Sequence, residues 1–407
     1  MFQILKRQWL RDLLLGAGLL LFGAGLVAAP GEAIAGAKEG LGLCGNVIVP
    51  SLFPFFVLSA LAVDLGLAAC LGRAMERVMR PLFRVNGCCA AAVVMGFVGG
   101  YPVGARTALG LYQQGLCSRE EAERLLAFCN NSGPAFILGV VGAGVFGSGR
   151  VGLLLYLTHA LSSLLVGLLF RFHGAPPGRA GAPGGAARPQ FKAVRAGAAF
   201  TDAVGKALQS TLNICAFVVF FSVMLRLLAA FGVLSAAARL LGLFGVGPEW
   251  ARRLVAGLLE LSSGVASLAG AGAGGVPMAA FMLGWAGLSV HCQVLSFLAD
   301  SGLGVRTYLL GKLCHGAIAA ALTWAFTRLF PLDAPVSAYL ADQARSIAGA
   351  DFSSALAIST ASAFALWAVL TAVCARVVKK KLWKIRPSWS IIGKTAARPF
   401  GRAGNAV

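Results

Sequence analysis

The chain has 407 residues, of which 58% are hydrophobic and only 12% are charged. The charged share is about half of the ~25% that is usual in soluble proteins. Several runs contain no Asp, Glu, Lys or Arg and reach the ~20 apolar residues that a membrane-crossing helix needs: Leu13–Gly31, Val151–Phe170, Ala207–Leu225 and Leu261–Ala299. These runs are continuous rather than alternating, which excludes a transmembrane β-barrel. The composition predicts an all-α polytopic membrane protein.

The formal net charge of +20 would also fit a nucleic-acid-binding surface. Once the apolar runs are read as helices, most Lys and Arg residues fall on one side of the membrane. That asymmetry is typical of a cytoplasmic face. We therefore expect a protein of the bacterial inner-membrane type with both termini in the cytoplasm. We expect the lipid bilayer as its surroundings and no nucleic acid as a partner.

The ten cysteines are scattered and include no C-x-x-C pair. Their spacing predicts neither a structural disulfide nor a metal site. The chain contains no G-x-S-x-G, H-E-x-x-H, P-loop or dinucleotide motif, so no catalytic set is predicted. We expect a protein that is not an enzyme and that holds no cofactor.

In chain order, residues 1–43 are predicted to form an N-terminal transmembrane helix, Leu13–Gly31, followed by a short external loop. Residues 44–172 are predicted to form a first repeat. Its parts are a crossing at 44–65 that is bent by prolines, a re-entrant hairpin at 87–111, a broken helix at 125–147 and a crossing at 151–172. Between the hairpin and the broken helix, Ser118 and Glu121 fit a capping box that opens a surface helix.

Residues 173–209 are predicted to be a Pro/Gly/Ala-rich linker and a basic helix along the membrane surface. Residues 210–330 repeat the first half in outline, with a crossing at 210–230, a hairpin at 249–275, a broken helix at 278–297 and a crossing at 308–329. Three crossings are an odd number, so the second repeat is inverted relative to the first. Residues 331–378 supply an external loop and a last transmembrane helix, and residues 379–407 form a basic cytoplasmic tail.

The first half offers polar groups where its apolar helices are interrupted. Irregular backbone at membrane depth is tolerated only inside protein or beside a wet cavity. The candidate substrate-binding residues are Gly99, Gly100, Tyr101, Pro102, Arg106, Asn130, Asn131 and Ser132. Arg106 could hold a carboxylate or could be a charge at the cytoplasmic rim. Asn130–Ser132 could bind an anion beside freed N–H groups or could simply cap a kink.

In the second half, the ionisable groups at membrane depth are functional hypotheses by default. Gly/Pro-interrupted apolar segments in matching places of two halves indicate a transporter's substrate site. Glu260 and His291 are predicted to couple transport to an ion, either a proton or sodium, and Glu260 could also accept a hydrogen bond from the substrate. Glu260 could instead pair with Lys312 or Arg226, and His291 could be a satisfied buried histidine. Ser262, Ser263, Ser289 and Gln293 are further candidates for substrate binding. His159 and His315 fall at similar places in the two repeats, and we interpret them as helix-packing groups.

Three stretches carry a resemblance to a known family: GFVGGYPVGA, GLCSREEAERLLAFCNNSGPAFILGVVGAGVF and GWAGLSVHCQVLSF. The chain resembles the YlbJ-type sporulation integral membrane proteins, also called stage V sporulation protein V, from about Asn46 to Phe330. These proteins belong to the nucleoside-recognition, or Gate-domain, superfamily. The resemblance implies an outline similar to concentrative nucleoside transporters, with the candidate residues of both halves facing one cavity. It also suggests a homo-oligomer.

The same resemblance implies a function, namely alternating-access transport of dipicolinic acid across the outer forespore membrane during sporulation. Dipicolinate is a flat pyridine with two carboxylates, on whose ring Tyr101 could stack. Two alternatives remain open. The same fold could carry a nucleoside or another organic acid, or the protein could be a membrane scaffold for spore-envelope assembly that transports nothing.

Overall fold

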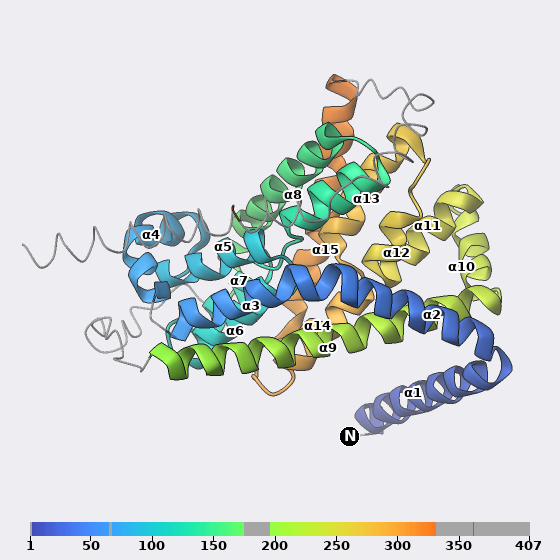
Figure 1. The fold of residues 1–407 in the computed structure, drawn as a ribbon, viewed down its shortest axis with the longest axis horizontal. Coiled ribbons are helices and arrows are strands. Elements are labelled where there is room, and N and C mark those ends of the chain that lie inside the picture. Colours follow the sequence, from blue (N-terminus) through green and yellow to red (C-terminus); the bar gives the residue numbers. More distant parts are fainter. Residues whose placement is uncertain (1, 65–66, 175–195, 331–360, 362–407) are drawn as a thin grey trace, which may run out of the picture.

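The structure, a computed structural model, describes residues 2–64, 67–174, 196–330 and 361. All elements within these ranges are helical, as Figure 1 shows. This agrees with the predicted all-α class. The first half contains α1 (Phe2–Ala28), α2 (Pro30–Leu43), the π-helical η1 (Cys44–Ile48), α3 (Val49–Asp64), α4 (Leu67–Phe83), η2 (Gly87–Cys89), α5 (Ala90–Gly99), α6 (Val103–Gln113), α7 (Arg119–Leu126), the π-helical η3 (Ala135–Val145), α8 (Gly149–Leu169) and η4 (Phe170–Phe172).

The second half contains α9 (Ala196–Ala230), α10 (Val233–Gly242), α11 (Pro248–Leu259), α12 (Leu261–Ala266), η5 (Gly272–Gly274), α13 (Gly275–Trp285), α14 (Gly287–Leu298) and α15 (Val305–Leu329). By length and apolar composition, four segments of the described chain are able to cross a membrane: 149–172, 199–230, 272–298 and 305–329. Two bent helix pairs, 15–46 and 75–99, raise that number to six if each pair is one span.

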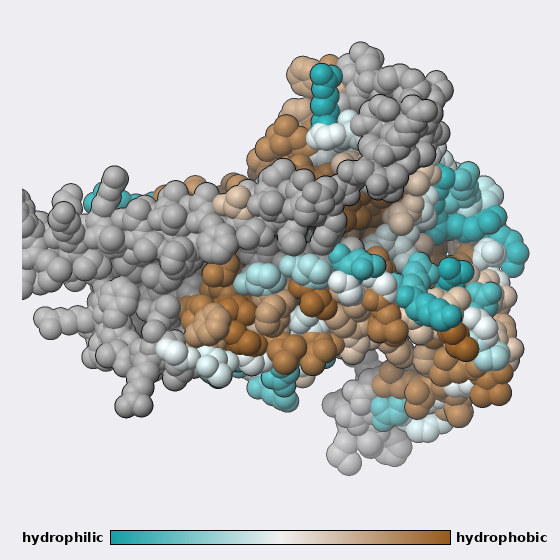
Figure 2. Space-filling view, viewed as in Figure 1, coloured by the Kyte–Doolittle hydropathy of each residue, from teal (hydrophilic) through white to brown (hydrophobic). Residues whose placement is uncertain are grey.

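The outward-facing residues of these helices are apolar. On α8, Leu153, Leu157 and Leu161 expose 43–57% of their surface, and α9 exposes Leu208 and Leu212 by more than half. Figure 2 shows apolar residues gathered over α8 and α9. A soluble protein rarely exposes so many large apolar side chains along one helix. Together with the apolar spans, they identify an integral membrane protein whose lipid-facing surface includes these helices.

The expected external loop near residues 31–39 is wrong, because α2 is helical from Pro30. The chain turns by 101° between the first two helices and then continues through η1 into α3. Together α2, η1 and α3 pack along the 35-residue α9, as the blue and green helices in Figure 1 show. Gly36 and Gly40 permit the contact, because a Cβ on either would lie 2.8 or 2.7 Å from a Cα atom of α9.

The expected basic surface helix before residue 210 is also not a separate element. From Ala196 onward it is the first part of the continuous α9, which packs against α3. The predicted capping box at Ser118 is confirmed, since its hydroxyl accepts from the Glu121 N–H while the Glu121 carboxylate accepts from the Ser118 N–H. The Pro/Gly/Ala-rich linker from residue 175, the last predicted transmembrane helix and the basic tail lie outside the described residues, apart from residue 361.

Two buried apolar clusters hold the helices together. The larger cluster joins α5 to α8 of the first half with α12 to α15 of the second half. The smaller one packs η1 and α3 against α9. Because the larger cluster contains residues from both halves, the interruptions of both halves are held near one another at the centre of the molecule.

Candidate functional site

The first predicted hairpin is present, with α5 and α6 as its two arms. Gly96 and Gly104 face each other across the arms, and the Cys129 carbonyl lies where either residue would place a Cβ. The tip is Gly100–Pro102, with a cis Tyr101–Pro102 bond. Gly100 has φ +78°, and a Cβ there would lie 2.9 Å from the Gly133 nitrogen. Only glycine fits this left-handed position at such close approach. The tip therefore touches the break at Asn130–Pro134 through backbone atoms.

The second half contains a similar pair of interruptions. Its hairpin arms are α11 and α12, with Gly257 and Gly264 facing each other and Glu260 at the tip. The break between α13 and α14 lies at Ala286, and Gly287 has φ +80°. A Cβ on Gly287 would lie 2.9 Å from the Leu261 nitrogen. Here too, the hairpin tip meets the break of the following helix through backbone atoms.

Glu260 is almost fully buried, with 2% of its surface exposed, and acts as the N-cap of α12. Its carboxylate accepts hydrogen bonds from the Ser262 and Ser263 N–H groups at 3.0 and 2.6 Å. A carboxylate at this position satisfies free N–H groups and favours the positive end of the helix dipole. It forms no ion pair with Lys312 or Arg226 in the described part of the chain. Arg226 instead pairs with Glu39 at 3.2 Å.

Lys312 of α15 lies at the centre of the molecule with no exposed surface. Its Nζ donates to the Tyr101 hydroxyl at 2.8 Å and to the Asn130 carbonyl at 2.9 Å, and lies 3.3 Å from His315 Nδ1. It also lies over the Tyr101 ring, 4.7 Å from its centroid. All of these contacts are with neutral groups, and no described carboxylate pairs with this lysine. A buried ammonium normally needs a counter-charge.

Two histidines continue the polar centre from Lys312 to the first break. His315 Nε2 lies 3.0 Å from the His159 carbonyl, and the two imidazole rings are 4.3 Å apart. His159 Nε2 accepts from the Ser132 N–H at 3.0 Å. Thr323 and Thr158 join the same two helices with a 2.8 Å hydrogen bond. The interpretation of both histidines as helix-packing groups agrees with the α8–α15 contact, yet they also connect Lys312 to Ser132.

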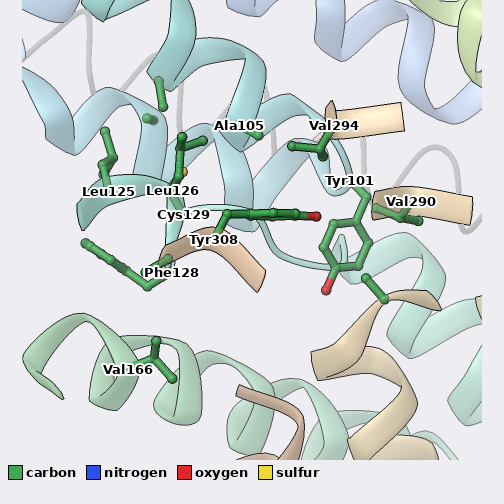
Figure 3. Close-up of a cluster of buried hydrophobic side chains, with 14 of the residues drawn as sticks. Tyr101, Ala105, Leu125, Leu126, Phe128, Cys129, Val166, Val290, Val294 and Tyr308 are labelled. Atoms are coloured by element: carbon green, nitrogen blue, oxygen red, sulfur yellow. The ribbon is translucent and has the colours of Figure 1, made fainter. Parts of the chain in front are cut away.

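A second branch leads to α14. The Tyr308 hydroxyl lies 3.0 Å from His291 Nδ1 and 3.4 Å from Asn130 Nδ2. Trp285 lies edge-on to the His291 ring. Figure 3 shows Tyr308 extending toward Tyr101 among apolar neighbours such as Val290 and Val294. The Tyr101 hydroxyl donates to the Leu283 carbonyl at 2.6 Å, which links the first hairpin to α13 of the second half.

Several polar atoms of this centre are buried without a hydrogen-bond partner in the described residues. They are Asn130 Oδ1, Asn131 Oδ1, His159 Nδ1, Ser289 Oγ and His291 Nε2. Buried polar atoms usually have partners, and each exception needs an explanation. Two of them, Asn130 Oδ1 and His159 Nδ1, belong to residues that connect to Lys312, Asn130 directly and His159 through His315.

Comparison with known proteins identifies the family. The family model described as Gate, nucleoside recognition, matches residues 47–170, which include the first hairpin and the first break. The chain is 31% identical over 332 residues to the sporulation integral membrane protein YlbJ of Bacillus subtilis (strain 168), covering 76% of this chain and 81% of that protein. The chain belongs to the YlbJ family. No solved structure matches it.

Most predicted site residues of this YlbJ family member are buried in or near the polar centre, the first hairpin tip or α14. Tyr101, Asn130 and Ser132 meet at the polar centre through Lys312 and His159, and His291 joins them through Tyr308. Gly99, Gly100, Pro102 and Asn131 are buried in the hairpin tip and the break beside it. Ser289 and Gln293 are buried on α14.

The other candidates have different surroundings. Ser262 and Ser263 contribute backbone N–H groups to the Glu260 cap. Arg106 is half-buried on α6, with its guanidinium 5.8 Å from the Phe297 ring centroid, and reaches no group of the polar centre. The roles of all these residues in binding or coupling stay predictions.

Sequence reasoning missed Lys312 and Tyr308 as site residues. A signal for Lys312 was available, because it is the only charged residue between Arg306 and Arg328 in an otherwise apolar helix. An intramembrane lysine is a functional candidate by default. Tyr308 carried no such signal, since tyrosine is also common at membrane interfaces. In the described residues, no three His, Cys, Asp or Glu side chains group as metal ligands.

Proposed function

We propose that this chain is a secondary transporter that moves a small anionic solute by alternating access. The observation that carries the proposal is Lys312, a fully buried lysine with neutral neighbours and no described carboxylate partner. A bound carboxylate would supply the missing negative charge and would accept from the ammonium. The unpartnered His159 Nδ1 offers a further donor, because His159 Nε2 is the accepting nitrogen.

The order of elements supports an inverted repeat. The first half runs through a long helix (α2–α3), a short helix (α4), a hairpin (α5–α6), a broken helix (α7–η3) and a crossing (α8). The second half runs through α9, α10, the α11–α12 hairpin, the broken α13–α14 and α15 in the same order. Inverted repeats with interrupted helices place a transporter's substrate at their interface, near the middle of the bilayer. In this proposal Lys312 lies at that interface, since it contacts residues of both halves.

The solute we propose is dipicolinic acid, carried across the outer forespore membrane during sporulation. The name of the Bacillus subtilis relative refers to sporulation, and dipicolinate is a flat dianion. One carboxylate would bind Lys312, and the ring would lie beside Tyr101 and Tyr308, two rings that extend into the same centre. The second candidate is a nucleoside, which the description of the matching Gate model favours.

Uptake into proteoliposomes tests these assignments. The purified chain is reconstituted and given labelled dipicolinate or labelled uridine across an imposed proton or sodium gradient. We expect saturable dipicolinate uptake that Lys312→Gln reduces at least tenfold, because a hydrogen bond to a charged group contributes about 1.5–3 kcal/mol. Arg150→Gln is the matched control, since it removes one positive charge from an exposed position on α8.

Other outcomes of this assay decide between the alternatives. Uptake of uridine alone would identify the protein as a nucleoside carrier. A nucleoside has no carboxylate, so its binding would not require a positive charge at Lys312. Uptake of neither solute by protein that elutes as a folded monodisperse species would favour a membrane scaffold for spore-envelope assembly.

A further inference from the structure

We infer that the coupling ion is a proton and that Lys312 carries it. One proton binds to the Nζ atom when the solute carboxylate binds beside it, and the proton and the anion leave together. The inference rests on the proposed transport function and names the residue that links it to an energy source. The sequence suggests Glu260 and His291 as the coupling residues. We assign that role to Lys312 instead, which residues from both halves of the molecule surround.

The geometry around the Nζ atom fits an ammonium group. His315 Nε2 faces the His159 carbonyl, which can only accept, so Nε2 carries the hydrogen. In neutral His315 the lone pair therefore lies on Nδ1, which faces Lys312. The Tyr101 hydroxyl donates to the Leu283 carbonyl, so its oxygen accepts from Lys312. With the Asn130 carbonyl, three acceptors surround a group that has three N–H donors only when it is protonated.

The charge of that ammonium is not compensated. Among the described residues Lys312 forms no ion pair, and both Glu260 oxygens already accept backbone N–H groups of α12. In the described part of the chain, the titratable groups that face Lys312 from the surrounding elements are neutral or basic: Tyr101 of the first hairpin, Cys129 before the first break, His159 of α8, His291 of α14 and His315 of α15 itself.

A site with three acceptors and no counter-charge behaves differently when full and when empty. With the solute bound, the ammonium and the carboxylate neutralise each other inside the membrane. Without the solute, a lone ammonium at this depth is unfavourable. The proton therefore leaves the Nζ atom for water on the side where the solute is released, and the neutral amine returns through the empty carrier. No bond of the solute changes. One proton accompanies each dipicolinate dianion and balances one of its two carboxylates, so each cycle moves one net negative charge.

Two transport modes separate this inference from the function on which it rests. Liposomes clamped at zero potential with valinomycin and potassium receive labelled dipicolinate either with a proton gradient, acidic outside, or with unlabelled dipicolinate inside. Net uptake requires the empty carrier to return, whereas exchange does not. For the wild-type chain we expect exchange in the absence of a gradient. With the gradient, the ratio of inside to outside dipicolinate concentration should rise about tenfold for each unit of imposed pH difference.

Lys312→Arg is the decisive variant, because a guanidinium stays protonated. We expect exchange to persist and pH-driven net uptake to fall at least tenfold, whereas Arg150→Lys, an exposed control, retains both modes.

A second measurement counts the protons directly. The pH-sensitive dye pyranine inside the liposomes reports proton entry, and we expect one proton to enter per dipicolinate in the wild-type chain. This measurement stands even if the arginine variant fails to fold.

Three results would overturn the inference. Wild-type accumulation that ignores the pH gradient would exclude proton coupling while leaving transport intact. Lys312→Arg that still accumulates dipicolinate with the gradient would move the proton to another group, and loss of coupling in Glu260→Gln or His291→Gln would identify that group. A wild-type chain that performs neither uptake nor exchange would overturn the transport function and the inference together.

Discussion

At the scale of single residues, Glu260 and Lys312 are both buried and ionisable, but their surroundings differ. Glu260 accepts two backbone hydrogen bonds and stabilises a helix start. Lys312 has neutral acceptors and no opposite charge among the described residues. Removing the Glu260 carboxylate would leave two buried N–H groups without an acceptor, whereas no described counter-charge depends on Lys312, so the two residues should respond differently to substitution.

The first prediction therefore concerns stability. Lys312→Met should lower the Tm of the detergent-solubilised, solute-free protein by a few degrees at most, because the empty carrier holds a neutral amine and the acceptors around it lose hydrogen bonds worth about 1 kcal/mol. Lys38→Met, at an exposed position on α2, is the matched control and should leave the Tm nearly unchanged. The measurement is a thermal shift assay. A fall of more than about 5 °C for Lys312→Met would mean that this lysine anchors the fold.

At the scale of elements, glycines decide which backbones can touch. The Cys129 carbonyl occupies the space where Gly96 or Gly104 would place a Cβ. The two hairpin arms and the segment before the first break are thus packed backbone against backbone. Side chains at these positions would force the arms of the hairpin away from that segment.

The second prediction follows from this contact. Gly104→Ala should lower stability by more than about 2 kcal/mol, because overpacking a close backbone contact costs about 1–3 kcal/mol and the carbonyl cannot rotate away. Gly42→Ala on α2, where nothing lies within 4 Å of the added carbon, should instead gain up to about 1 kcal/mol from helix propensity. Fluorescence-detected size exclusion after a heating series measures both. Equal melting of the two variants would contradict the close approach.

The interruptions also mark the limit of what the sequence could predict. Glycine and proline identified the breaks at Gly99–Pro102 and Asn130–Pro134, because these residues resist a continuous helix. In the second half, glycine predicted interruptions at Gly284 and at Gly287–Ser289, and the break lies beside Gly287, at Ala286. The positive φ of Ala286 itself, +80°, had no signal in the sequence, because alanine is a strong helix former. The segment after Leu13–Gly31 was expected to be a loop, yet it is helical, and Gly36 and Gly40 allow it to pack against α9.

At the scale of the whole molecule, the contact between α8 and α15 joins the two halves. His159 and His315, at similar places in the two halves, lie there with their ring centroids 4.3 Å apart, and Thr323 donates a hydrogen bond to Thr158. The similarity of these helices was visible in the sequence, but their contact was not, because sequence similarity between repeats does not give their crossing point. Lys312 was missed for the same reason, since its neighbours come from distant parts of the chain.

The third prediction tests this junction. The Thr158→Cys, Thr323→Cys double variant should form a disulfide on mild oxidation in membranes, because hydroxyls 2.8 Å apart place the two Cβ atoms within the range that a disulfide spans. A protease site inserted in the linker after residue 174 separates the halves, and non-reducing electrophoresis shows whether they stay joined. Thr158→Cys alone is the control. Fragments that separate in the double variant would contradict the α8–α15 contact.

The backbone contacts at the interruptions have a consequence for how this fold can evolve. Each hairpin tip meets its neighbouring break through main-chain atoms at glycine, Gly100 against Gly133 and Gly287 against Leu261. Main-chain contacts do not depend on the identity of nearby side chains. Side chains beside these contacts, such as Ser289, can therefore be exchanged over generations without loss of the framework. One scaffold can acquire a new cargo by substitution at a handful of positions, while its glycines stay under constraint.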